Sequence, residues 1–312
     1  NSRKFVLLSR MEDQKRKKPK EHGYQSATSR EDWLRWRNGG IGGSDAGVAL
    51  GVNPYSSPLR LYLEKKKGIR FPVTGTAIDL GHQLEPMVIA QAQIFYPKRI
   101  KHLEDLPMMS HPDHPWMLAT VDAGVAAGSH GPGIVEAKTS LSRHGHMGWL
   151  DGNIPAHYRA QVLHYLAVTG RSWGCIVALT EGPNWYKHII EPDRHELDEL
   201  IEAESRLWKA IQDDDFEFLI DGTDRTTKAL STLYPEAEES KEVDLRGNTK
   251  AEEALLQYLT SKRFEKAAGE DKKEAENQIK SIMGDHEVAH FGAAEIKWKN
   301  TARGRRFTVK EL

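Results

Sequence analysis

The sequence predicts an α/β protein, because segments typical of strands and of helices alternate along the chain. Strand-like runs bounded by turn residues occur at 119–140 and 174–191. Apolar residues at helical spacing occur at 79–95, 156–169 and 197–211. The 312 residues, 38% hydrophobic and 29% charged, suffice for one large domain or two small ones.

The N-terminal residues 1–28 are predicted to form a disordered arm. They contain the basic run 15–20 and few side chains that could pack. An arm that contacts DNA is the alternative interpretation.

A glycine-rich turn follows, between short helices. Ser29 caps a predicted helix that leads to Arg37, and the turn 39–47 enters an apolar helix over 46–50. Ser44 in this turn and the guanidinium of Arg37 could bind an anion together. Glycine-rich turns are weak signals alone. A further helix is expected over 59–66.

Residues 79–95 are predicted to be helical, with Glu85 beside the apolar stripe. Pro86 disfavours a helix interior, so the helix is expected to start near Glu85 or to kink there. A carboxylate at such a break could be a metal ligand, and an ordinary surface glutamate is equally compatible with the sequence.

The stretch 119–140 is predicted to be a β-hairpin with its turn at 128–133. Asp122 is placed on the first strand, and Glu136 and Lys138 on one face of the second. Two carboxylates suit a hard cation such as Mg²⁺, and an ammonium nearby can stabilise charge on a phosphate. Taken alone, the pattern is more often a solvated hairpin.

The C-terminal half supplies further elements. Pro155 and Gly170 bound a predicted helix over 156–169, on which Gln161 shares a face with Tyr158 and Tyr165. Such a glutamine is more often a structural amide. The remaining expectations are a loop at 143–153, strands at 174–180 and 185–191, a helix from 193 to 213, a linker or surface loop over 221–248, a long charged helix or helical hairpin at 249–283 broken near Gly269, and terminal strands at 295–300 and 305–309.

Composition excludes several classes of protein. No apolar run approaches the roughly 20 residues that a membrane span needs. The run 5–8 is too short for a signal-peptide core, so a cytoplasmic setting is expected. Cys175 is the single cysteine, which excludes a disulfide framework or a cysteine-rich metal site. The net charge of −1 neither indicates nor excludes nucleic-acid binding.

Several weak motifs occur together in one order. They are Arg37 with Gly42-Gly-Ser-Asp45, Leu84-Glu-Pro86, Asp122, Glu136-Ala-Lys138 and Ile154-Pro-x-x-Tyr-x-x-Gln161. Their order and spacing resemble the YqaJ-type viral recombinases, relatives of lambda exonuclease in the PD-(D/E)xK nuclease superfamily. The resemblance covers roughly residues 30–190, and the C-terminal tail also looks like these proteins.

The resemblance implies a mixed central β-sheet flanked by helices, a restriction-endonuclease-like core at 29–220, followed by a helical C-terminal extension at 249–312. It also implies a Mg²⁺-dependent 5′→3′ exonuclease that digests linear double-stranded DNA and leaves 3′ single-stranded overhangs. Two Mg²⁺ ions per active site are expected, with Mn²⁺ as an alternative metal. The expected partners are DNA with a 5′-phosphorylated end, a single-strand annealing protein of the RecT/Beta-like kind, and two further copies of this chain in a homotrimer of phage or prophage origin in a bacterial cell.

The family's site residues carry over to matching positions. The implied metal ligands are Asp122, Glu136, Glu85 and the main-chain carbonyl of Ala137, and the implied catalytic residues are Lys138 and Gln161 together with the three carboxylates. Arg37, Ser44 and Thr120 match positions that bind the terminal 5′ phosphate. The sequence departs from the family pattern at three positions. Thr120 stands where family members may carry a serine. The family's Pro-Asp is Val121-Asp122 here, and its Asp-Gly is interrupted by Ala123.

Two other activities are compatible with the sequence. One is a structure-specific endonuclease of the same superfamily, of which the iron–sulfur members need several cysteines. The other is a non-catalytic scaffold that binds DNA ends and takes part in recombination. A scaffold would be expected to lose acidic ligands or the motif lysine, and all are present here.

Overall fold

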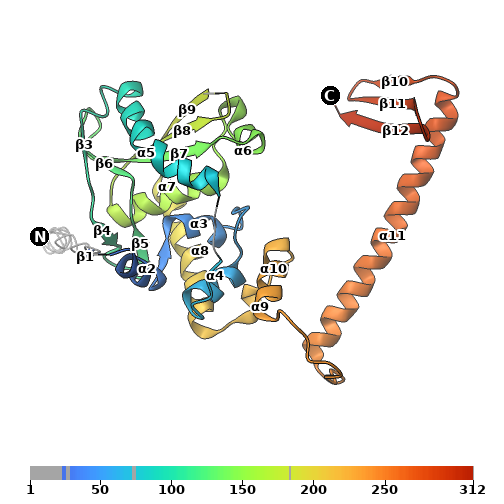
Figure 1. The fold of residues 1–312 in the computed structure, drawn as a ribbon, viewed down its shortest axis with the longest axis horizontal. Coiled ribbons are helices and arrows are strands. Elements are labelled where there is room, and N and C mark those ends of the chain that lie inside the picture. The colour runs from blue at the N-terminus through green and yellow to red at the C-terminus, as the bar shows by residue number, and fades with distance from the viewer. Residues whose placement is uncertain (1–22, 26–28, 72–74, 183, 312) are drawn as a thin grey trace, which may run out of the picture. The chain divides into compact units, whose positions relative to one another are not determined.

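The computed structural model describes residues 23–25, 29–71, 75–182 and 184–311 (Figure 1). The chain divides into two compact units, Asn1–Pro235 and Glu236–Leu312. The arm predicted over 1–28 lies outside the described residues, apart from strand β1 (Gly23–Gln25).

The first unit contains a five-stranded mixed sheet. Its order is β3-β6-β7-β8-β9, in which β7 and β8 are parallel and the other neighbours are antiparallel. The strands are β3 (His102–Glu104), β6 (Ala123–Ala127), β7 (Gly133–Ser140), β8 (Gly174–Thr180) and β9 (Asn184–Ile190). The predicted mixed α/β class is confirmed.

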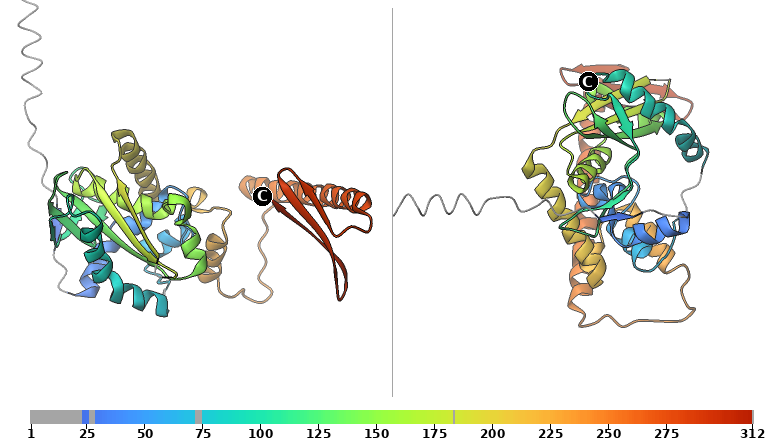
Figure 2. Two further views of the ribbon diagram at one scale, coloured as in Figure 1. Left: turned by 90° about the horizontal axis from the view of Figure 1, so that it is seen from above. Right: turned by 90° about the vertical axis from the view of Figure 1, so that its left-hand side faces the viewer.

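Helices cover both faces of this sheet, as Figures 1 and 2 show. Side chains alternate along β7, so Val135 and Ala137 pack with α5 (Thr76–Phe95) on one face. Ile134 belongs to the core on the other face, with α7 (Ala156–Thr169). Glu136 and Lys138 therefore lie on the α7 side of the sheet.

A second, smaller sheet has the order β1-β4-β5-β2. Its other strands are β4 (Met108–Ser110), β5 (Met117–Ala119) and β2 (Ile41–Gly42). Strand β2 runs parallel to β5 and leads directly into helix α3 (Gly43–Ala49). The glycine-rich turn of the sequence thus begins with a short strand, which fixes α3 beside the end of β5.

Helices build the rest of the first unit around a core of its own. They are α2 (Arg30–Asn38), α4 (Pro58–Lys65), α8 (Arg194–Asp213), α9 (Phe216–Leu219) and α10 (Asp224–Leu233). Leu59 and Leu63 of α4 pack there with Leu207 and Ile211 of α8. The linker or loop predicted over 221–248 therefore differs from the structure, because Thr223 caps α10 and Ala229 of that helix is buried in the same core.

The structure bears on two local predictions. Of the two expectations for 79–95, a start near Glu85 is wrong, because helix α5 begins at Thr76 and continues through Pro86. One lost backbone hydrogen bond is tolerated because Val88 and Ala92 in this helix are fully buried against the sheet. The predicted loop at 143–153 contains helix α6 (Arg143–Met147) and a 3₁₀ turn, η1 (Leu150–Gly152).

The second unit consists of one long helix and a three-stranded antiparallel sheet. Helix α11 (Thr249–Met283) passes through Gly269 without a break, which decides between the two expectations for this segment. The sheet has the order β10 (Val288–Phe291), β11 (Ala294–Thr301) and β12 (Gly304–Glu311). Among the helices described in either unit, none has the length and apolar character to cross a membrane.

Candidate active site on strand β7

Asp122 lies just before β6, not on a hairpin strand as predicted. The chain leaves the small sheet after Ala119 and enters the large sheet at Ala123, so Thr120–Asp122 connect two sheets. The hairpin itself is β6–β7, with Ala123 opposite Val135. Asp122 Oδ2 accepts a hydrogen bond of 2.8 Å from the backbone N of Ala137. This bond holds the carboxylate against β7.

Glu136 is the centre of the site. Its Oε1 accepts from Lys138 Nζ at 2.5 Å and from Gln161 Nε2 at 2.7 Å. Gln161 Nε2 also lies 3.1 Å from the hydroxyl oxygen of Tyr165, and Lys138 Nζ lies 5.2 Å from the ring centroid of Tyr158. The glutamine on the aromatic face of α7 is thus bonded to the carboxylate of β7, which the sequence alone did not favour.

The electrostatics of the site are set by burial. The side chain of Glu136 is 1% exposed, and burial together with the Asp122 carboxylate raises its pKa to about 8. Burial likewise raises the pKa of Asp122, against the Lys138 charge. Burial disfavours the ammonium of Lys138, but Glu136 and Asp122 outweigh it and raise the pKa of this lysine. The Glu136 and Asp122 carboxyl groups and the Lys138 ammonium therefore titrate as a coupled group, and a cation bound by the two carboxyl groups would favour their ionised forms.

One oxygen of the site is available for a metal ion. Glu136 Oε2 is buried and has no hydrogen-bond partner. Buried polar atoms are normally satisfied, and an unsatisfied carboxylate oxygen beside a second carboxylate fits the oxygen ligation of Mg²⁺. Within the described part of the chain, however, no three His, Cys, Asp or Glu side chains form a ready metal cluster.

Glu85 lies near this pair but apart from it. It projects from α5 with 40% of its side chain exposed, and His82 Nδ1 is 3.9 Å from its Oε2. Partial burial, and then the Asp122 carboxylate, raise the pKa of Glu85. The two carboxyl groups therefore interact through space, while Glu85 keeps access to solvent.

The residues expected at the phosphate site are partly brought together. Arg37 Nη2 donates to Ser44 Oγ at 2.6 Å and to Asp45 Oδ1 at 3.0 Å. Lys65 Nζ lies 2.7 Å from Asp45 Oδ2, and the backbone N of Gly42 donates to the same oxygen. Arg37 and Lys65 hold the pKa of Asp45 well below its usual range, although burial opposes them. A buried carboxylate thus orients Arg37.

Thr120, the third residue expected at the phosphate site, is exposed one position beyond β5. Strands β2 and β5 are parallel, with Gly42 opposite Leu118, so Ser44 and Thr120 each lie two residues beyond this pair at the same end of the small sheet. The two residues therefore follow neighbouring parallel strands at the same end of the small sheet.

Sequence reasoning missed the groups that support these side chains. Asp45 occupies a capping position that could have been noticed, whereas nothing in the sequence pairs it with Lys65, which is 20 residues away. His164 of α7 and Glu204 of α8 form another buried pair, with 2.8 Å between His164 Nδ1 and Glu204 Oε1. His164 Nε2 lies 2.9 Å from the carbonyl oxygen of Leu118, which ties α7 and α8 to β5 just before Thr120.

Comparison with known proteins identifies the family. Residues 32–172 match the family model of the YqaJ-like viral recombinase domain. The chain is 31% identical over 290 residues to the uncharacterized protein YqaJ of Bacillus subtilis (strain 168), a match that covers 91% of this chain and 88% of the relative. The chain therefore belongs to the YqaJ family of viral recombinases.

Solved structures share weaker likeness. An alkaline exonuclease from Laribacter hongkongensis, LHK-Exo, is 19% identical, with a TM-score of 0.49 over 65% of this chain and 99% of that one. A phage-related exonuclease from Haemophilus somnus 129PT is 13% identical, with a TM-score of 0.41 over 57% of this chain and 96% of that one.

Proposed function

We propose that this protein is a metal-dependent 5′→3′ exonuclease that hydrolyses linear double-stranded DNA and leaves 3′ single-stranded overhangs. The observation that carries the proposal is the site on β7, where Glu136, Lys138 and Asp122 converge and Glu136 Oε2 is buried without a partner. Membership of a viral recombinase family fits a reaction that prepares DNA ends for recombination.

Asp122 and Glu136 would hold Mg²⁺, with Glu85 and the main-chain carbonyl of Ala137 as further oxygen donors. A bound Mg²⁺, with Mn²⁺ as an alternative and a second ion expected, would neutralise charge on the scissile phosphate. That ion would favour the ionised form of Glu136, with any proton released to solvent. The resulting carboxylate keeps Lys138 charged and in place.

Lys138 acts on the attacking water and on the phosphate. Its ammonium is fixed between Glu136 Oε1 and the Tyr158 ring, so it reaches the reacting oxygens without losing further side-chain entropy. A preorganised cation in a site from which water is largely excluded stabilises developing negative charge. Gln161 restrains Glu136 from the α7 side and limits its rotation.

Arg37, Ser44 and Thr120 would bind the terminal 5′ phosphate. Arg37 has a hydroxyl partner in Ser44 and a buried counterion in Asp45, so its guanidinium is already oriented before DNA binds. This arrangement favours ends that carry a phosphate. We further propose that the chain forms a homotrimer and that a single-strand annealing protein binds the 3′ single strand that digestion leaves.

Digestion of end-labelled linear duplex tests the reaction, its polarity and the metal together. The duplex carries a label on either the 5′ or the 3′ end, and digestion is followed in Mg²⁺ and in chelator. We expect early release of the 5′ label in Mg²⁺ and no release in chelator. Early release of the 3′ label would contradict the polarity, and cleavage of covalently closed circles would indicate an endonuclease. Binding to DNA ends without digestion in Mg²⁺ would indicate a scaffold.

A further inference from the structure

One face of the sheet of the second unit carries the side chains that contact α11, and the other face does not. On the face toward α11, Trp298 and Phe307 lie opposite each other, and Lys280 Nζ of α11 is 5.8 Å and 5.4 Å from their ring centroids. Ile296 on the same face is buried. Because side chains alternate along a strand, the neighbouring positions Lys299 and Arg306 point to the other face.

The other face of this sheet is strongly basic. We call Lys297, Lys299, Arg306 and Lys310 the basic face; all four share the side of the sheet that points away from Trp298 and Phe307. Lys299, Arg306 and Lys310 are exposed. Among the described positions of β10–β12, Glu295 is the single carboxylate on this side, and it pairs with Lys297 at 2.5 Å.

Two of these cations face each other directly. Lys299 and Arg306 are partners across β11 and β12, and like charges in that position destabilise a sheet. The flanking positions on the same side, Thr301 and Thr308, carry hydroxyls and no compensating charge. A bound polyanion would offset this repulsion.

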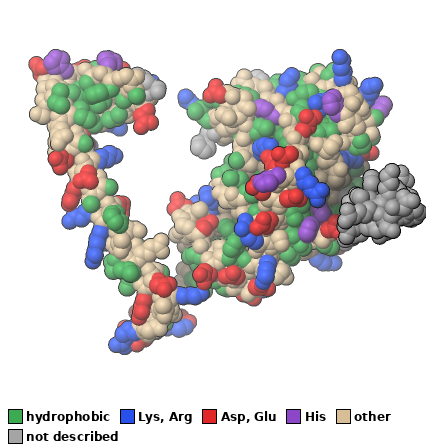
Figure 3. Space-filling model, turned by 180° about the vertical axis from the view of Figure 1, so that it is seen from behind, with side chains coloured by type: hydrophobic (Ala, Val, Ile, Leu, Met, Phe, Trp, Pro, Cys, Tyr) green, Lys and Arg blue, Asp and Glu red, His purple; other side chains and the backbone are tan. Residues whose placement is uncertain are grey.

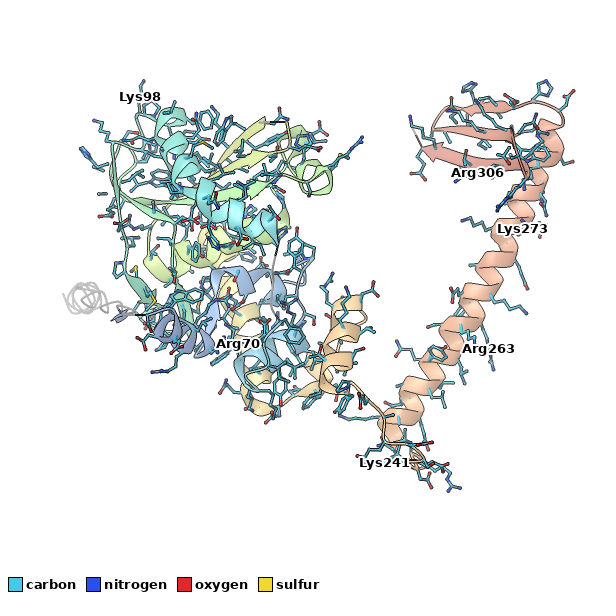
Figure 4. All side chains as sticks on the ribbon, viewed as in Figure 1. Arg70, Lys98, Lys241, Arg263, Lys273 and Arg306 are labelled. Carbon is cyan, nitrogen blue, oxygen red and sulfur yellow. The ribbon has the colours of Figure 1, made fainter. Side chains whose placement is uncertain are left out.

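The fold does not use Lys299 and Arg306 in the way that it uses Arg305. The guanidinium of Arg305 donates to the carbonyl oxygens of Gly284, His286 and Trp298 and lies 3.6 Å from the Trp298 ring centroid, so it joins the segment that follows α11 to the sheet. Lys299 and Arg306 make no comparable contact among the described residues. Figure 4 shows where Arg306 lies on β12.

The chemistry of the basic face favours a phosphate backbone over a membrane surface. Val288 is the one apolar residue of β10–β12 on this side, whereas peripheral membrane binding buries an apolar face among the lipids. The hydroxyls of Thr301 and Thr308, interspersed with lysine and arginine, are typical of groups that contact phosphate and sugar. Along α11, by contrast, acidic and basic side chains alternate (Figure 3).

We infer that the basic face binds the phosphate backbone of DNA, as a second binding surface separate from the site on β7. The choice of DNA among polyanions rests on the proposed function. Contacts of this kind depend on charge and are independent of sequence, so they hold the substrate without selecting it.

The test is equilibrium binding of a fluorescent duplex to the full chain in chelator, measured by anisotropy at several salt concentrations. The double variant Lys299→Gln/Arg306→Gln should lower the slope of log K against log salt by about 2, because each lost phosphate contact contributes about 0.9. Glu295→Gln should bind more tightly than the wild type. The matched control is Lys262→Gln/Arg263→Gln on α11, which removes the same charge from the same unit and should leave the slope unchanged.

Three results would overturn the inference. The first is an unchanged slope for Lys299→Gln/Arg306→Gln, and the second is an equal loss in the α11 control. The third is a lowered melting temperature of the double variant, because relief of the like-charge pair should leave stability equal or higher. The proposed function is judged separately: under single-turnover conditions with saturating protein, the double variant should digest short duplexes at a rate within about twofold of the wild type.

Discussion

Glu136 combines three properties that seldom occur in one carboxyl group. It is buried, it shares Oε1 between Lys138 and Gln161, and its Oε2 has no partner. Burial of such a group is unfavourable unless its charge is compensated. The site is therefore built at a cost to stability that a cation would remove.

The pKa of about 8 makes this cost dependent on pH. A carboxyl group whose pKa rises on folding stabilises the folded state while protonated, and this contribution is lost as pH rises through the folded pKa. The metal-free protein should therefore melt at a lower temperature at pH 9 than at pH 6.5, and Mg²⁺ should restore more at pH 9. Glu136→Gln should remove most of the drop. A melting temperature equally pH-dependent in Glu136→Gln would contradict the assignment of this titration.

At the residue scale, the proposed function makes Arg37 the residue that selects DNA ends carrying a 5′ phosphate. Arg37→Ala should digest duplexes with 5′ phosphate and 5′ hydroxyl ends at nearly the same rate, because the phosphate contact is lost. The wild type should prefer the phosphorylated end by at least about tenfold, which corresponds to one charge-assisted hydrogen bond of about 1.4 kcal/mol. An unchanged preference in Arg37→Ala would refute the phosphate site. Arg35→Ala, on the same helix, provides the matched control.

At the scale of elements, Asp45 connects α2, α3 and α4. Its carboxylate forms ion pairs with Arg37 of α2 and with Lys65 of α4, and the Lys65 side chain is 1% exposed. Asp45→Asn leaves a buried ammonium and a guanidinium without their counterion, so unfolding free energy should fall by about 3 kcal/mol. Denaturant unfolding measures this. Asp198→Asn, which removes an exposed carboxylate 3.6 Å from Arg194 on α8, should cost less than about 0.5 kcal/mol. Equal effects of the two substitutions would contradict the structural role of Asp45.

Elements marked by local signals were predicted well. Helix 156–169 agrees with α7 at both ends, because Pro155 and Gly170 mark its limits in the sequence. Strand 174–180 agrees with β8, a continuous apolar run. Asp122 was misplaced on a strand because the change of sheet between Ala119 and Ala123 depends on tertiary pairing, which no local pattern records.

The same distinction holds in the candidate site. Glu136 and Lys138 were placed on one face from strand alternation alone, and their contact agrees with this. The bond from Gln161 to Glu136 joins residues 25 positions apart, and helix periodicity could give only the face on which Gln161 lies. The support of Arg37 by Lys65 through Asp45 is likewise a tertiary feature.

At the scale of the whole molecule, the chain comprises two units with separate roles in this account. The first carries the site on β7, and the second carries the basic face. The proposed homotrimer should give a light-scattering mass of three chains in solution. A mass of one chain at micromolar concentration would contradict trimer formation.

The central claim is that Lys138 on β7 takes part in phosphodiester hydrolysis. The most direct measurement is the single-turnover rate at which Lys138→Met digests a 5′-phosphorylated duplex in Mg²⁺, beside Lys98→Met, which removes an exposed lysine distant from β7 in sequence. We expect Lys138→Met to be slower by at least about 10²-fold, with DNA affinity nearly unchanged, because a preorganised charge is lost from the transition state. Lys98→Met should digest at the wild-type rate. Digestion by Lys138→Met at the wild-type rate would contradict the account.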